Sequence, residues 1–305
     1  MNTELKIGLA LGSGSSRGWA HIGIINALSE LGIEPDVVCG TSVGAMVGAS
    51  YVSGNMEKLQ AWACSVSKLD VAKFFDINTS MTGFVHTKRF HAYLNENVAS
   101  DEIVIENLAK VYAAVSTDLE TGREVWFTQG SIVQAVWASM AMPGLFPAIR
   151  NDKRWLVDGG LVNPVPVSVC RALGADIVIA VNLNGDIVGK HLVKFKPIKK
   201  QNNGVAGKIN DLVKEYTNFS MFNNKNGESP PSLMDAIAGS INITQDRLTR
   251  SRMAGDPPDV VLSPRLPDIG QLELYRANEA ITEGKNCVLR KRAEIEYILG
   301  KTQTT

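Results

Sequence analysis

The sequence predicts an α/β fold in which a mostly parallel central sheet is covered by helices on both faces. Short apolar segments alternate along the chain with helix-forming segments, which is the pattern of strands joined by crossover helices. Residues 176–183 (DIVIAVNL) are an unbroken run rich in β-branched side chains, typical of a parallel strand buried on both sides. The chain has 305 residues, 45% of them hydrophobic, and is long enough for one large core.

The first elements alternate in this way. Residues 6–11 are predicted to form a short apolar strand, and residues 19–31 a helix rich in good helix formers. Gly32 is suited to end that helix, because glycine adopts the left-handed conformation at low cost. A second buried strand is expected at residues 35–39, followed by a helix of small residues at 45–50.

The middle of the chain predicts a hairpin and a capped helix. Residues 110–116 have strand character, and a turn at 120–122 leads to a second strand at 124–127. Ser131 is a good N-cap for a helix that runs to about Met140.

The remaining core elements are a strand at residues 154–157, which ends in Asp158-Gly159-Gly160, and a helix at 165–173. The chain is expected to be one domain, residues 1–305, with its core at 6–183. Residues 185–231 are polar and predict a lid-like or flexible excursion. A C-terminal helical elaboration then covers 232–299, with helical stretches at 232–253 and 272–299 and a short strand at 259–262.

Composition excludes some functional classes. Lysine and arginine together number 31, as do aspartate and glutamate, so the basic excess typical of a nucleic-acid binder is missing. The four cysteines have no C-x-x-C spacing, which favours reduced thiols. The sequence has neither a signal-peptide pattern nor an apolar run of membrane-spanning length. We therefore expect a cytoplasmic protein.

A candidate nucleophile lies between the second strand and its helix. Gly40-Thr41-Ser42-Val43-Gly44 is a G-x-S-x-G motif in strand-to-helix context, where glycines permit the sharp turn of a nucleophile elbow. Ser42 is the candidate nucleophile, and the amide of Val43 is one candidate donor to an oxyanion. The start of the following helix also favours negative charge.

A second set of oxyanion donors is expected in residues 12–18 (GSGSSRG), because a loop of small residues can point consecutive amides at one anion. The competing interpretation is a dinucleotide-binding fingerprint. It requires a glycine where Arg17 stands, and no ribose-binding acid follows at the expected distance. The nucleotide interpretation therefore fits less well.

The catalytic base is harder to assign. His191 follows Asp158 in the order of a triad, but it lies in the polar excursion, where an exposed histidine is the simpler interpretation. His21 fits a helix surface or a structural hydrogen bond. His86 and His91 are five residues apart, a poor spacing for a metal site.

Asp158 ends a strand and precedes two glycines. It is a candidate general base if exclusion of water raises its pKa, and equally a candidate turn cap.

Taken together, Gly14-Ser15-Ser16-Arg17-Gly18, the elbow motif and Asp158-Gly159-Gly160 resemble the patatin-like phospholipase family, in order and in separation. The stretch 138–147 (ASMAMPGLFP) is also similar to the segment that precedes that family's catalytic aspartate. The resemblance covers about residues 6–182 and is strongest to small bacterial members that consist of little more than the catalytic domain.

The resemblance implies a Ser-Asp dyad, with Ser42 as nucleophile and Asp158 as general base. It implies an oxyanion hole made by amides around Gly14, Ser15 and Ser16, together with Val43. The supporting motif residues are Arg17, Gly18, Gly40, Gly44, Gly159 and Gly160. It also implies esterase activity on phospholipids, lysophospholipids or other hydrophobic acyl esters, with no metal or cofactor; the sequence contains no calcium-binding loop.

The chain departs from the family at one point. The family loop is typically a glycine triplet, but this sequence has Ser13-Gly14-Ser15, and serine tolerates positive φ poorly. An alternative is therefore a regulatory or interaction protein on the same scaffold, with weak or no hydrolytic activity.

Residues 190–200 interleave lysines with apolar side chains, and residues 219–222 add more apolar surface. This part of the chain is expected either to contact an anionic lipid surface, such as the inner face of a membrane, or to be a solvated basic loop. The expected partner is a lipid or hydrophobic acyl ester, and the sequence identifies no protein partner.

Overall fold

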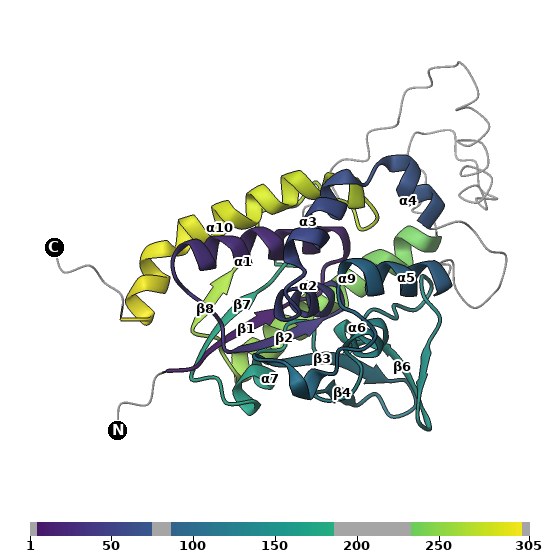
Figure 1. Ribbon diagram of the computed structural model, residues 1–305, viewed down its shortest axis with the longest axis horizontal. Helices are drawn as coiled ribbons and strands as arrows, with labels where there is room; N and C mark the ends of the chain where they lie inside the picture. Colours follow the sequence, from purple (N-terminus) through teal and green to yellow (C-terminus); the bar gives the residue numbers. More distant parts are fainter. Residues whose placement is uncertain (1–4, 75–86, 186–232, 301–305) are drawn as a thin grey trace, which may run out of the picture.

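The computed structural model describes residues 5–74, 87–185 and 233–300. Its strands form one sheet in the order β5-β6-β3-β2-β1-β7-β8, and β4 pairs with β3 outside this path (Figure 1). The strands are β1 (Ile7–Leu11), β2 (Val37–Thr41), β3 (Val111–Asp118), β4 (Glu124–Phe127), β5 (Ile149–Asn151), β6 (Arg154–Asp158), β7 (Ile177–Val181) and β8 (Val260–Leu262).

The central strands β3, β2, β1, β7 and β8 run parallel, which confirms the predicted mostly parallel sheet. The antiparallel strands β4, β5 and β6 gather beside β3 at one end of the sheet. β4 forms the predicted hairpin with β3, and β6 lies antiparallel to β3 with Asp158 opposite Ser116.

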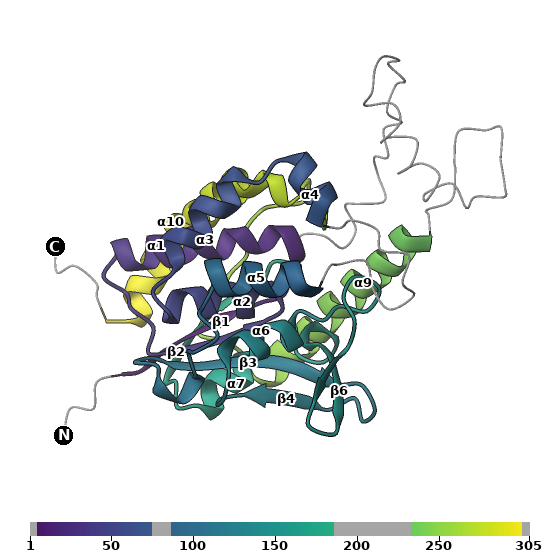
Figure 2. The ribbon, with the colours of Figure 1, turned by 45° about the vertical axis from the view of Figure 1, so that its right-hand side comes forward.

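Helices cover both faces of this sheet. They are α1 (Ala20–Glu30), α2 (Val43–Val52), α3 (Met56–Ser65), α4 (Lys68–Phe74), α5 (Thr87–Asn97), α6 (Ile132–Ser139), α7 (Val167–Ala172), α9 (Leu233–Gly255) and α10 (Ala277–Ile298). Short 3-10 helices are η1 (Ser15–Trp19), η2 (Ile105–Asn107), η3 (Gly159–Leu161) and η4 (Leu274–Arg276). Figures 1 and 2 show α1, α3 and α10 together on one side of the sheet.

Alternate residues of the central strands pack into two separate cores. In β1, Leu9 and Leu11 belong to the larger core with α1, α2 and α10, whereas Ala10 belongs to the smaller core with α7. Successive side chains of a strand point to opposite faces, so a strand covered on both sides must be apolar at every position. This is why β1, β7 and the first four residues of β2 appear in the sequence as unbroken apolar runs.

Helices α3, α4 and α5 were not predicted from the sequence. Helix α3 buries only Leu59 and Ala63. In α5, Phe90 and Leu94 are four residues apart and share one buried face. So few apolar positions make a weak periodic signal, and tertiary packing supplies the stability of these helices.

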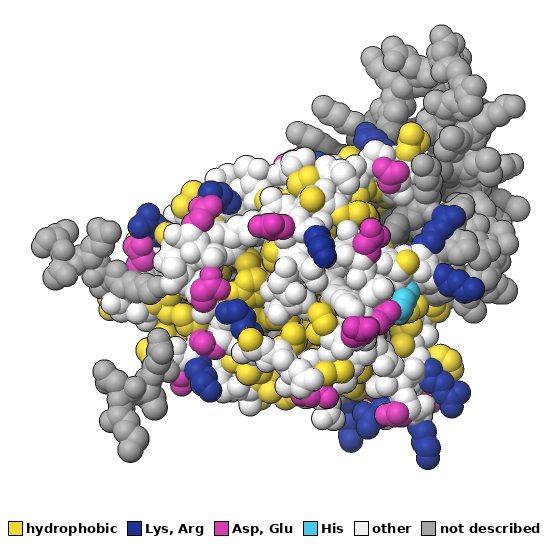
Figure 3. Space-filling view, viewed as in Figure 1, with side chains coloured by type: hydrophobic (Ala, Val, Ile, Leu, Met, Phe, Trp, Pro, Cys, Tyr) yellow, Lys and Arg dark blue, Asp and Glu magenta, His cyan; other side chains and the backbone are white. Residues whose placement is uncertain are grey.

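Three further expectations concern the polar excursion, membrane-spanning helices and the distribution of surface charge. The polar excursion lies outside the described residues from position 186 onward. In the described part of the chain, none of the helices combines the length and the hydropathy needed to span a membrane. On the face shown in Figure 3, side chains of both charges are interspersed, as the balanced composition predicts.

Candidate active site

Ser42 alone makes the turn between β2, which ends at Thr41, and α2, which begins at Val43. Its φ of 57° and ψ of −124° are unusual for a residue with a side chain, and such strain is typical of functional turns. Gly44 permits this turn to lie against β1, because a Cβ at that position would be 2.1 Å from the carbonyl oxygen of Leu11. The result is a buried serine at the N-terminus of a helix, where the helix dipole favours negative charge.

Asp158 lies at the end of β6 and faces Ser42. Ser42 Oγ donates a hydrogen bond to Asp158 Oδ2 over 2.6 Å, and the amide of Gly160 donates to Asp158 Oδ1 over 2.7 Å. Burial raises the pKa of Asp158 to about 6, although both hydrogen bonds act in the opposite direction. The carboxyl group is therefore ionised at neutral pH and a stronger base than an exposed aspartate, which suits it to accept the proton of Ser42.

Ser139 holds the backbone of the elbow. The amide of Ser42 donates to Ser139 Oγ over 2.8 Å, and Ser139 Oγ donates to the carbonyl of Val115 in β3 over 2.5 Å. The sequence did not assign Ser139 a role, although Ser139 lies in the stretch 138–147, which is similar to the segment that precedes the catalytic aspartate of the patatin-like family. Its position at the end of α6 ties the elbow to the sheet.

The loop after β1 contains two residues whose conformations decide where its amides point. Gly14 is extended, with φ of 167°, whereas Ser15 has φ of 52°, in the left-handed region. The carbonyl of Gly14 accepts from the amide of Arg17 over 3.3 Å and from Arg17 Nε over 3.2 Å. Because the C=O and N–H of a trans peptide point in opposite directions, the Ser15 amide faces away from Arg17.

Arg17 and His21 support this loop through hydrogen bonds to its main-chain carbonyls. Arg17 is 2% exposed, and burial lowers its pKa to about 10, so the guanidinium is still charged at neutral pH. His21 is buried, and its Nε2 donates to the carbonyl of Gly12 over 2.8 Å. Burial lowers the pKa of His21 to about 4, so it is neutral at neutral pH. This is the structural hydrogen bond that was one of the two expectations for His21.

The predicted oxyanion donors are not equivalent. Among the described residues, no hydrogen bond is recorded from the amides of Gly14, Ser15 and Val43. The Ser16 amide, in contrast, donates to the main-chain carbonyl of Gln271 over 3.3 Å. The first three amides are therefore the ones available to a developing oxyanion.

A pocket with a mostly apolar lining leads to Ser42. Its cavity volume is about 80 Å³, so the pocket is narrow. Ser42, Ser15 and Gln271 form one polar part of its wall, and the remainder is aromatic, aliphatic or thioether. The lining residues are Ser15, Trp19, Ser42, Val43, Met46, Trp62, Phe90, Tyr93, Met140, Met142, Leu145, Phe146, Gln271, Leu272 and Leu274. A lining of this kind is chemically compatible with an apolar group beside Ser42.

Two residues of the site come from parts of the sequence that carried no motif. Gln245 of α9 accepts from Ser13 Oγ and from Asn184 Nδ2, each over 3.1 Å, and so joins α9 to the loop after β1. Gln271 precedes α10 and contacts the same loop through its main chain. Neither residue type is distinctive in sequence, so no signal could have identified them.

Of the other histidines, only His91 lies among the described residues, and it is separate from this constellation. His91 lies on the surface, with its Nε2 3.2 Å from Asp101 Oδ1. His86 and His191 lie outside the described residues, as do the basic stretch at 190–200 and the apolar residues at 219–222.

Comparison with known proteins gives the family. Residues 9–171 match the patatin-like phospholipase family. An uncharacterized NTE family protein of Mycobacterium bovis is 37% identical over 184 residues, which are 60% of this chain and 51% of the relative. Human patatin-like phospholipase domain-containing protein 6 is 32% identical over 193 residues, 59% of this chain and 14% of that protein.

The chain thus spans about half the length of the mycobacterial relative and less of the mammalian one. Among solved structures, VipD from Legionella pneumophila covers 94% of this chain and 66% of its own, with a TM-score of 0.46 and 13% sequence identity. Because the family match extends over more than half of the sequence and contains both the elbow and Asp158, this chain belongs to the patatin-like phospholipase family.

Proposed function

We propose that this protein is a serine hydrolase of lipid acyl esters in which Ser42 is the nucleophile and Asp158 the general base. The observation that carries the proposal is the 2.6 Å hydrogen bond from Ser42 Oγ to Asp158 Oδ2 in a buried site. Family membership supports lipid hydrolysis in general, and the apolar pocket supports a hydrophobic acyl group.

In the acylation step, Ser42 Oγ attacks the carbonyl carbon of the ester and its proton moves to Asp158 Oδ2. The negative charge that develops on the carbonyl oxygen is stabilised by the amides of Gly14, Ser15 and Val43 and by the N-terminus of α2. Collapse of the tetrahedral intermediate breaks the bond to the alcohol, which takes the proton from Asp158. The acyl group is left on Ser42.

In the second step, a water molecule gives a proton to Asp158 and attacks the acyl carbon. Cleavage of the bond to Ser42 Oγ releases a fatty acid and restores the serine with the proton held by Asp158. The proposed substrate class is a phospholipid, lysophospholipid or other hydrophobic acyl ester.

The test is covalent labelling with a fluorophosphonate, followed by intact mass. We expect one adduct on the wild-type protein, no adduct on Ser42→Ala, and labelling of Asp158→Asn slowed by about 10²- to 10⁴-fold, the usual contribution of a general base. Ser50→Ala is the matched control, because Ser50 is buried in the helix that follows Ser42 and its hydroxyl has no hydrogen-bond partner among the described residues. An unlabelled but folded wild-type protein would refute the proposal.

The second candidate is a regulatory or interaction protein with weak or no hydrolytic activity. It is favoured by one observation, the left-handed Ser15 where the family typically has glycine. If this candidate is right, the folded protein resists the probe with and without lipid vesicles, and Ser42→Ala retains the protein's cellular role.

A further inference from the structure

The oxyanion loop, residues 13–18, is held from outside by the segment that precedes α10. We refer to residues 268–276 as the strap. The main-chain carbonyl of Gln271 in the strap accepts hydrogen bonds from Ser15 Oγ, from Ser16 Oγ over 2.6 Å and from the Ser16 amide over 3.3 Å. One carbonyl thus holds two consecutive residues of the loop.

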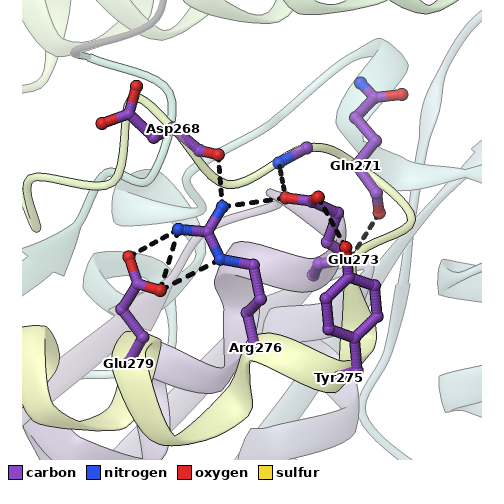
Figure 4. Close-up of polar contacts among 8 residues, drawn as sticks. Asp268, Gln271, Glu273, Tyr275, Arg276 and Glu279 are labelled. Atoms are coloured by element: carbon purple, nitrogen blue, oxygen red, sulfur yellow. Dashed lines mark hydrogen bonds and ion pairs between the residues drawn. The ribbon is translucent and has the colours of Figure 1, made fainter. Parts of the chain in front are cut away.

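The strap is itself held together by Arg276. Its Nη1 donates to Glu273 Oε2 over 2.9 Å and to the carbonyl of Asp268, and its Nη2 donates to Glu279 over 2.7 Å (Figure 4). Glu273 Oε2 also accepts from the amide of Gly270 over 2.9 Å. These contacts close the turn on which Gln271 lies. Figure 4 shows the Asp268 carbonyl, Glu273 and Glu279 around the guanidinium, with Gln271 beyond Glu273.

The conformation of Ser15 explains why the oxyanion loop needs support from the strap. A serine in the left-handed region has a conformational cost that glycine does not have. That conformation, with the Gly14 carbonyl turned to Arg17, is what directs the Ser15 amide away from Arg17. Without an external contact, an L-residue at this position would tend to relax toward negative φ and carry the amide with it.

We propose that the strap positions the oxyanion loop, with Arg276 as the positioning residue. This inference rests on the proposed hydrolase function. Arg276 fixes the turn, the Gln271 carbonyl holds the hydroxyls of Ser15 and Ser16, and Ser15 is thereby kept in the conformation that presents its amide. In this chain the strap compensates for serine at a position where the family typically has glycine.

The same contacts have an opposite interpretation, in which the strap occupies donors of the loop and suppresses activity. The two interpretations predict opposite signs. If the strap positions the loop, loosening it slows acylation; if the strap suppresses the site, loosening it accelerates acylation.

The experiment is the rate of fluorophosphonate labelling of Ser42 in Arg276→Met, measured by intact mass over a range of probe concentrations. The maximal rate is expected to fall by roughly 10- to 100-fold, less than the loss on removing an oxyanion donor outright, with the half-saturating concentration nearly unchanged. The control is Arg292→Met in α10, the helix that follows Arg276, and it breaks the Glu296 ion pair about 24 Å further along. Its labelling rate should equal that of the wild type.

A second arm asks whether the effect passes through Ser15. In a Ser15→Gly background, the loss caused by Arg276→Met should shrink to a few-fold, because glycine needs no support at positive φ. Amide hydrogen exchange of residues 13–18 should accelerate in Arg276→Met and not in Arg292→Met. If Arg276→Met does not fold, Arg276→Lys is measured instead, which retains charge but not the bidentate contact.

The outcomes separate the two proposals. A labelled wild type with equal rates in Arg276→Met and Arg292→Met overturns the strap's role and leaves the hydrolase proposal standing. Faster labelling of Arg276→Met, a change in half-saturation alone, or an undiminished loss in the Ser15→Gly background also overturns it. A folded wild type that is not labelled overturns both.

Discussion

Replacing Asp158 with asparagine is expected to stabilise the fold at neutral pH while it slows acylation. Burial raises the pKa of Asp158 from 3.8 to about 6, which means that folding disfavours its ionised form. Asparagine has nearly the same shape and no charge. Its oxygen can accept from the Gly160 amide and its NH₂ group can donate to Ser42 Oγ, so the variant keeps two hydrogen bonds and removes the buried charge.

The sign and the size follow from proton linkage. The folded protein binds this proton more tightly than the unfolded chain does. The contribution to stability is therefore fully present below about pH 4 and is lost as the pH rises through about 6. A shift of about two pKa units corresponds to about 3 kcal/mol in the free energy of unfolding at pH 8. Roughly 1 kcal/mol of this is lost between pH 5 and pH 8.

The assay is urea unfolding of the wild type and of Asp158→Asn at pH 5 and pH 8. The stability gained by the variant should be larger at pH 8 than at pH 5 by roughly 1 kcal/mol, and the comparison cancels groups common to both proteins. The matched control is Asp152→Asn, which makes the same chemical change at an exposed residue and carries no burial cost. An equal difference at both pH values, or a variant less stable than the wild type at pH 8, would refute the reasoning.

Two further outcomes are expected. The labelling rate of Ser42 should rise about tenfold per pH unit below about pH 6 and level off above about pH 7, because only ionised Asp158 accepts the proton; a midpoint near pH 7.5 would point to another base. Ser139→Ala should lower the free energy of unfolding by about 1–3 kcal/mol and slow labelling, since it leaves the Ser42 amide without its acceptor. Ser50→Ala is its control, and equal losses in the two variants, measured by urea unfolding, would contradict the role given to Ser139.

The parts of the fold that could be predicted are those with a strong local pattern. The strands β1 and β7 are apolar at every position, and β2 is apolar at every position before Thr41, because both of their faces are buried. Short apolar segments of this kind can be recognised in a sequence. Ser131 accepts from the amide of Gln134 and caps α6, as its residue type predicts. The elbow could be predicted because a sharp turn next to packed backbone restricts which residues are tolerated at Gly44.

The parts that could not be predicted depend on groups that every residue carries or on packing between distant segments. Gln271 acts through its main-chain carbonyl, so no side-chain type marks it in the sequence. Ser139 is one of many serines, and its role exists only because α6 ends beside the elbow. Helices α3 and α5 bury few side chains, and their contacts come from the completed core.

By itself, the sequence determined the alternation of strand and helix, the strained turn at Ser42 and the position of Asp158 at a strand end, because these depend on neighbouring residues. Only the tertiary structure decided that Ser42 and Asp158, 116 positions apart, come together, with Ser42 Oγ 2.6 Å from Asp158 Oδ2. It also decided that Gln271 contacts Ser15 from 256 positions away. The raised pKa of Asp158 belongs to the tertiary structure as well, since exclusion of water requires the whole core to surround the carboxyl group.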